Sequence, residues 1–276
     1  MSEIKVANPG SLTEEDWDFL LQIRTDAYLN DVLEGIKNRN RYFVDERFLK
    51  LLYDYAFGCK VITNSQEYVE PGRIFYRARV YYGPVVLSGD PKYSKGPFEG
   101  YNAEESFVPP PGKATSAGRI DPSYIRYLYT SSDIETSIFE SRATPGDSVS
   151  VAEIKVNKLC KMISFVQPAP VCWGEVGEKE KWLAGFALLL PNLFQTPRRS
   201  DEIYFMCQYI SEFYKNQGFD GIMFRSAFMP YCFGEDGVNL TFFNFEKCEA
   251  ISSSVYQVHK MALFTSPQIE HGRSGL

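Results

Sequence analysis

Apolar positions recur at helical spacing through the first 70 residues. A capping-box pattern, Ser11-Leu-Thr-Glu14, opens the first predicted helix. A second helix is predicted from about Asp45 to Phe57, where the apolar residues share one face and Gly58 follows as a stop signal. Pro71-Gly72 then interrupts the pattern. Residues 1–70 are therefore expected to form a helical N-terminal region.

From Arg73 the hydrophobic period changes to two, which predicts a strand over 73–82 with Arg77 and Arg79 on one face. Residues 83–118 are rich in Gly, Pro and Ser, and a loop of this length is often functional. A second capping box, Ser132-Asp-Ile-Glu135, predicts a helix that carries Glu140. Another helix is expected over 201–216. Further strands are expected at 124–130, 148–157, 222–227, 238–243 and 253–263.

The sum of these elements is an α+β protein. Three parts are expected: the helical region 1–70, a strand-rich domain over 71–265 and a frayed tail over 266–276. Hydrophobic residues make up 44% of the 276 positions and aromatics 15%, which is enough for a sizeable core.

Charge and composition exclude several functional classes. The net charge is −6 and Lys and Arg form no long run, so direct nucleic-acid binding is not expected. No apolar stretch reaches transmembrane length, and the N-terminus lacks a secretory pattern. Six scattered cysteines favour a reducing cytoplasmic location. Only two histidines occur, which argues against histidine-based zinc sites and Ser-His-Asp triads.

Four polar residues mark a possible site, although each has an ordinary interpretation when taken alone. Arg119 follows Gly118 in a loop, where most arginines are solvated. Glu140 lies on an amphipathic helix, Tyr129 ends a strand, and Ser226 is a small residue in a strand. Their order and spacing are more informative than their types.

The motifs that contain these residues together resemble the RES domain, over about residues 73–245. In chain order they are Phe75-Tyr-Arg77-Ala-Arg79, Gly118-Arg119, Leu128-Tyr129, Thr136-Ser-Ile-Phe-Glu140, Gly218-Phe-Asp-Gly-Ile-Met-Phe-Arg-Ser226 and Gly237-Val-Asn239-Leu-Thr-Phe-Phe243.

The resemblance assigns roles to individual residues. The family is named for an arginine, a glutamate and a serine, which correspond to Arg119, Glu140 and Ser226 as catalytic residues. Arg77, Tyr129 and Asn239 are implied as substrate-binding residues. Two features depart from the family pattern: Asp121 stands where the family usually has Asn, and about 70 residues precede the matched region.

The resemblance also implies a fold and a biological setting. The expected fold is a mixed sheet like that of ADP-ribosyltransferases. NAD⁺ is implied as a substrate, with no separate cofactor and no metal. Family members are bacterial toxins, many of them paired with a helix-turn-helix antitoxin, so such a partner is implied here too.

These residue types suit cleavage of the bond between nicotinamide and ribose. Nicotinamide in NAD⁺ departs neutral, so no general acid is needed, and one carboxylate, Glu140, can stabilise the positive charge on the ribose. Arg119 and Arg77 offer planar forks for the diphosphate. Tyr129 is expected to stack on the nicotinamide ring, and Ser226 to bond Glu140 or a ribose hydroxyl.

Three functions remain open from the sequence. The first is an NAD⁺ glycohydrolase. The second is a protein ADP-ribosyltransferase that uses the same pocket. The third belongs to another class, a catalytically silent RES-like module that acts through protein contacts.

Overall fold

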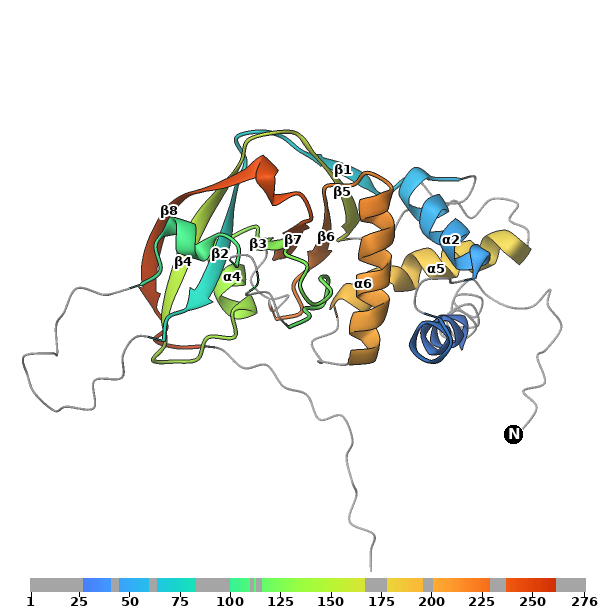
Figure 1. Cartoon of the computed structure of the whole chain (residues 1–276), viewed down its shortest axis with the longest axis horizontal. Coiled ribbons are helices and arrows are strands. Elements are labelled where there is room, and N and C mark those ends of the chain that lie inside the picture. The colour runs from blue at the N-terminus through green and yellow to red at the C-terminus, as the bar shows by residue number, and fades with distance from the viewer. Residues whose placement is uncertain are drawn as a thin grey trace, which may run out of the picture.

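The computed structural model has an α+β fold in which the longer helices gather at one end of a single mixed sheet (Figure 1). It describes residues 27–40, 45–59, 64–82, 100–109, 112, 116–166, 178–195, 201–228 and 237–261. The helices are α2 (Glu46–Phe57), α3 (Ala103–Ser106), α4 (Ile134–Glu140), α5 (Glu178–Gln195) and α6 (Asp201–Asn216), preceded by a helical segment over 27–38. The strands are β1 (Gln66–Val69), β2 (Ile74–Val80), β3 (Leu128–Ser131), β4 (Ser148–Val156), β5 (Cys160–Phe165), β6 (Gly221–Arg225), β7 (Val238–Phe242) and β8 (Cys248–Gln257).

The sheet has eight strands in the order β1-β5-β6-β7-β3-β2-β4-β8. Strands β5 and β6 are parallel, with α5 and α6 between them in the chain, and the other neighbouring pairs are antiparallel. The pairing between β2 and β3 is limited to Tyr76 with Ser131. The sheet therefore separates beside this pair into two parts, and the separation leaves room for a cavity.

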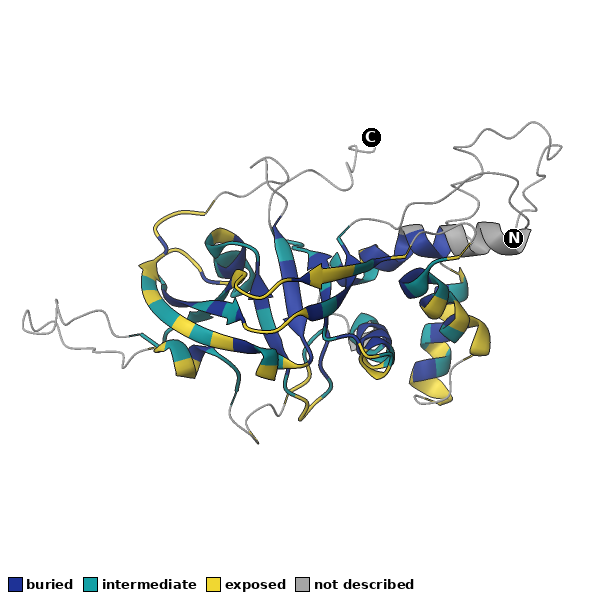
Figure 2. Ribbon diagram, turned by 90° about the horizontal axis from the view of Figure 1, so that it is seen from above, coloured by how far each residue is buried: buried dark blue, intermediate teal, exposed yellow. Residues whose placement is uncertain are grey.

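The largest hydrophobic core lies between the sheet and the helices. Helix α6 packs on β6, while α2 contacts α5 farther from the sheet (Figures 1 and 2). Phe165 of β5 stacks on Phe194 of α5, with ring centroids 4.4 Å apart. Tyr55 of α2 also stacks on Phe165, and its hydroxyl donates to the main-chain oxygen of Ser164 at 3.0 Å. Aromatic stacking thus joins the N-terminal helices to the sheet.

Several predicted elements are confirmed with small shifts at their ends. Helix α6 has the predicted bounds, and α2 begins one residue after its N-cap, Asp45, whose side chain accepts from the amide of Arg47 at 2.9 Å. Strands β2 and β4 lie where the period of two predicted them, and β6 and β7 overlap the strands expected over 222–227 and 238–243. The predicted α+β class is therefore correct.

Three predicted elements need correction. The strand expected over 124–130 begins only at Leu128, where its pairing with β7 starts, and Tyr124 has a positive φ of 70°, outside the β region. The N-cap of α4 is Asp133 and not Ser132, since the Asp133 carboxylate accepts from the amide of Thr136 at 2.7 Å. The last strand spans Cys248–Gln257 and not 253–263.

The sequence pattern also missed β1, β5 and α5. Strand β5 is buried on both faces apart from Lys161, so it shows no alternation of polar and apolar residues. The predicted helix at Ser11-Leu-Thr-Glu14 and the predicted tail over 266–276 lie outside the described residues. None of the described helices is long and apolar enough to cross a membrane.

The predicted boundary between residues 70 and 71 stays a prediction. Contacts nevertheless continue across it, because β1 pairs with β5 from Gln66↔Ile163 to Val69↔Cys160. Helix α2 and the 27–38 segment also contribute buried side chains to the same hydrophobic cluster as α5 and α6.

We expect Phe48→Ala to lower the free energy of unfolding by about 3–5 kcal/mol, the usual cost of truncating a fully buried phenylalanine. Phe48 is 0% exposed and packs edge-on against Phe186 of α5 at 5.9 Å. Lys50→Ala on the exposed face of the same helix is the matched control and should change stability far less. Urea denaturation measures both variants. If Phe48→Ala lowered the free energy of unfolding no more than Lys50→Ala does, α2 would contribute little to the shared core.

Candidate functional site

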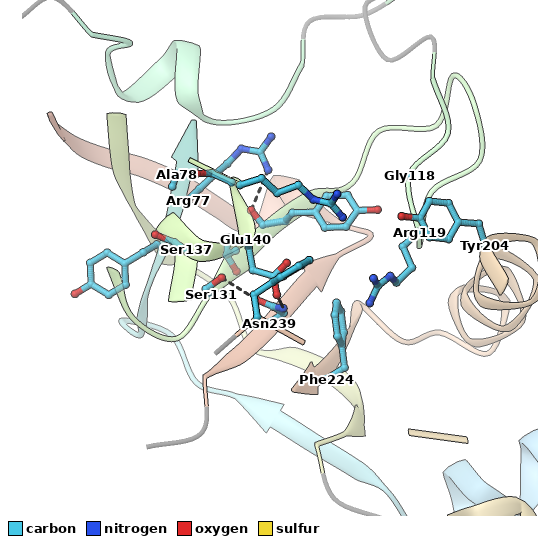
Figure 3. A pocket seen from close by; sticks show the side chains of 16 residues that line it. Arg77, Ala78, Gly118, Arg119, Ser131, Ser137, Glu140, Tyr204, Phe224 and Asn239 are labelled. Atoms are coloured by element: carbon cyan, nitrogen blue, oxygen red, sulfur yellow. Dashed lines mark hydrogen bonds between the residues drawn. The ribbon is translucent and has the colours of Figure 1, made fainter. Parts of the chain in front are cut away.

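A cavity of about 320 Å³ opens where β2 and β3 separate (Figure 3). Its walls come from β2, β3, α4, α6, β6, β7 and the turn at Gly118. Five of the six predicted site residues line it, and the sixth, Ser226, bonds to one of them. The five are Arg77, Arg119, Tyr129, Glu140 and Asn239.

Glu140 is the last residue of α4 and is half-buried in the cavity wall. Its Oε1 accepts from Ser226 Oγ at 2.7 Å and from Asn239 Nδ2 at 2.5 Å. Within the described part of the chain, no hydrogen bond reaches Oε2. The carboxylate is thus fixed through one oxygen, while the other is available to a ligand.

The two donors to Glu140 are themselves held by further hydrogen bonds. Ser226 directly follows β6, and its hydroxyl oxygen accepts from the amide of Phe228 at 3.2 Å, so its proton is directed to Glu140. Asn239 lies on β7 and is 6% exposed, and its Oδ1 accepts from Ser131 Oγ at 2.8 Å. This bond fixes the amide with its nitrogen toward Glu140.

Arg77 spans the separation between the two parts of the sheet. Its Nη1 donates to the main-chain oxygen of Tyr129 on β3 at 2.9 Å. Burial, together with the like charge of Arg79, lowers the pKa of Arg77 to about 10, so the side chain stays charged at neutral pH. Among the described residues, no group accepts from its buried Nε.

Arg119 lies on the opposite side of the cavity, in the turn after Gly118 (Figure 3). Its Nη1 donates to the main-chain oxygen of Phe194 at the end of α5. Its guanidinium carbon lies 5.9 Å from the centre of the Tyr204 ring, within cation–π range. These two contacts hold the guanidinium at this side of the cavity.

Tyr129 presents its ring to the cavity, but its hydroxyl is already engaged. The hydroxyl donates to Asp121 Oδ1 and accepts from the amide of Ile120 at 3.2 Å. Burial, with the nearby negative charge of Asp121, raises the pKa of Tyr129 well above its usual range. Tyr129 is therefore a neutral phenol at physiological pH.

Sequence reasoning missed several cavity residues. Arg142 lies two positions after Glu140, has a positive φ of 59°, and places its guanidinium 5.2 Å from the ring centre of Phe228. Tyr204 and Phe224 add aromatic walls, and Ser131 orients Asn239. Only the position of Arg142 beside Glu140 offered a clue, because the other contacts depend on elements far apart in the chain.

This arrangement suits a ligand with both anionic and cationic parts. Three guanidinium groups can receive negative oxygen atoms, and one carboxylate can stabilise positive charge. No group of His, Cys, Asp and Glu that could hold a metal ion occurs among the described residues. The functional roles of the individual residues remain predictions.

Comparison with known proteins places the chain in a family. The profile described as RES domain matches residues 89–264, more than half of the chain. None of the curated proteins matches. Among solved structures, the M. tuberculosis MbcT–MbcA toxin–antitoxin complex is similar with a TM-score of 0.39 and 12% identity, over 77% of this chain and 93% of that one. On the profile match, the chain belongs to the RES-domain family, whose toxins are NAD⁺-related enzymes.

Proposed function

We propose that this protein is an NAD⁺ glycohydrolase that cleaves the bond between nicotinamide and ribose. The observation that carries the proposal is the Glu140 carboxylate, bonded through Oε1 to Ser226 and Asn239 in a cavity that also holds arginines. The family and the resemblance of the motifs support NAD⁺ as the substrate, with no further cofactor.

The proposed step needs one carboxylate and one water. The ribose C–N bond breaks, its electron pair goes to the nicotinamide nitrogen, and neutral nicotinamide leaves. Glu140 stabilises the positive ribose that develops. A water oxygen then bonds to the ribose carbon, and its proton passes to solvent or to Glu140. Because Ser226 and Asn239 already orient the carboxylate, little reorganisation is required during the step.

In this proposal the arginines bind the diphosphate of NAD⁺. Arg77 gives one nitrogen to a main-chain oxygen, and no described group accepts from its Nε, so its planar fork keeps donors for phosphate oxygens. Arg119 brings a second planar fork to the opposite side of the cavity. Arg142 is more exposed and adds a third guanidinium to the cavity. A second cavity of about 250 Å³ shares Arg77, Gly118 and Tyr129 with the first, so more space for a dinucleotide adjoins it.

The remaining functions differ in what happens after the bond breaks. A protein ADP-ribosyltransferase would pass the ribose carbon to an acceptor side chain in place of water. A silent binding module would leave NAD⁺ intact. A helix-turn-helix antitoxin partner and a cytoplasmic location also belong to the proposal, since they follow from the family and the cysteine pattern alone.

The deciding experiment mixes the purified full chain with NAD⁺, with and without cell extract. Nicotinamide, free ADP-ribose and protein-bound ADP-ribose are then followed by chromatography and mass spectrometry. Free ADP-ribose supports the glycohydrolase, whereas ADP-ribose bound to protein would support the transferase instead. Intact NAD⁺ in both conditions would overturn the catalytic proposal.

We expect Glu140→Gln to lower kcat by about 10²–10³, the scale of losing one electrostatic catalytic group. KM should change little, because the charge matters only as the bond breaks. The melting temperature should hold or rise slightly, since Gln can still accept from Ser226 and Asn239 through its oxygen. Steady-state kinetics and a melting curve test this expectation.

Glu135→Gln is the matched control, since Glu135 is exposed on the same helix. It should leave kcat unchanged. A folded Glu140→Gln variant with wild-type turnover would remove Glu140 from the mechanism.

We expect Arg119→Lys to raise the Kd for NAD⁺ although the charge is kept, because Lys lacks the planar fork. The loss should reach roughly tenfold, the factor for one charged hydrogen bond. Arg47→Lys, on the exposed side of α2, is the control and should leave Kd unchanged. Calorimetry measures both values, and an unchanged Kd for Arg119→Lys would shift the phosphate role to Arg77 or Arg142.

A further inference from the structure

The turn from Gly118 to Asp121 determines where Arg119 enters the cavity. The Gly118 amide donates to the main-chain oxygen of Asp121 at 3.0 Å, which closes the turn. The Gly118 oxygen accepts from Gln208 Nε2 of α6 at 2.7 Å, and the Ile120 side chain is fully buried. The backbone on both sides of Arg119 is therefore anchored.

The Asp121 side chain is part of this anchor. Asp121 is 9% exposed, and its Oδ1 accepts from the Tyr129 hydroxyl. The same hydroxyl accepts from the amide of Ile120, the residue next to Arg119. One phenol thus connects the Asp121 carboxylate to the backbone of the turn.

Gly118 leaves the space that this contact needs. A Cβ added at Gly118 would overlap the Asp121 carboxylate and lie 2.8 Å from the Tyr129 hydroxyl oxygen. The turn, the phenol and the carboxylate are therefore closely packed against one another.

The Asp121 carboxylate also brings negative charge close to Arg77, since both residues line the second cavity, which shares Arg77, Gly118 and Tyr129 with the first. Burial raises the pKa of Asp121, while the hydrogen bond from Tyr129 and the charge of Arg77 oppose this shift. When ionised, Asp121 offsets part of the positive charge of Arg77 and opposes the approach of an anionic ligand.

We propose that Asp121 is a positioning residue that fixes Arg119 through the Tyr129 hydroxyl and moderates the affinity of the cavity for anions. The inference rests on the proposed function for its substrate, NAD⁺. It concerns binding and not the bond-breaking step, so its effects should appear in KM and leave kcat nearly constant.

Two substitutions separate position from charge. Asp121→Asn removes the charge and keeps an oxygen for the Tyr129 hydroxyl, so KM for NAD⁺ should stay equal to or fall below that of the wild type. Asp121→Ala removes both charge and acceptor. Its KM should exceed that of the Asn variant by about tenfold, the scale of one lost hydrogen bond, at similar kcat.

The route through the hydroxyl is tested in a Tyr129→Phe background. There the Asn and Ala variants at Asp121 should have the same KM, because the group that connects them to the turn is missing. A persistent tenfold difference would show that Asp121 acts by another route.

Limited trypsin digestion gives a readout that does not need activity. Cleavage between Arg119 and Ile120 should be faster in Asp121→Ala than in Asp121→Asn and the wild type, and the difference should vanish with Tyr129→Phe. If the wild type leaves NAD⁺ intact but cleavage is still faster in Asp121→Ala than in Asp121→Asn, the proposed function fails and the positioning role stands. If NAD⁺ is consumed and neither KM nor cleavage separates Asn from Ala, the positioning role is overturned.

Asp220→Asn is the control for loss of a partly buried, hydrogen-bonded carboxylate. Asp220 accepts from Lys247 Nζ at 2.7 Å and from the Lys161 amide at 2.9 Å, away from the Arg119 turn. This variant should lower the melting temperature and leave both KM and cleavage at Arg119 unchanged. A KM change of similar size in this control would show that general destabilisation explains the Asp121 effects.

Discussion

The limited pairing of β2 with β3 is the constraint on which the candidate site depends. The two strands are neighbours in the sheet but pair through Tyr76 and Ser131 alone. Arg77 donates a side-chain hydrogen bond to the Tyr129 carbonyl on the facing strand. The cavity lies where these strands separate, and residues of β2, β3, β6 and β7 form about half of its lining. The remaining lining comes from α4, α6 and the neighbouring turns, so the sheet and the helices together determine its shape.

A chain of hydrogen bonds then orients the carboxylate. Ser131 donates to Asn239, Asn239 and Ser226 donate to Glu140, and the Phe228 amide donates to Ser226. These groups come from β3, β7, α4 and the segment after β6, so the position of Glu140 depends on how these elements pack together. Leaving any buried member unpaired would cost about 1–3 kcal/mol, which favours a single arrangement.

The arginines follow the same principle of fixing a charge before a ligand arrives. Arg77 and Arg119 each donate to a main-chain carbonyl, which holds the guanidinium but does not cancel its charge. The helices behind Arg119 matter for this reason, since Phe194 belongs to α5 and Tyr204 to α6. Through the shared aromatic core, even α2 supports this side of the cavity.

The sequence by itself determined the α+β class, the helices α2 and α6, and the residues that resemble the RES motifs, because periodicity and motif order are local properties of a chain. It did not reveal β1 or β5, whose pairing partners are distant and whose side chains do not alternate cleanly. Tertiary structure alone decided that the Tyr129 hydroxyl bonds Asp121 and that Arg142 lines the cavity. These contacts join residues from separate elements, and only the packing of those elements sets which side chains meet.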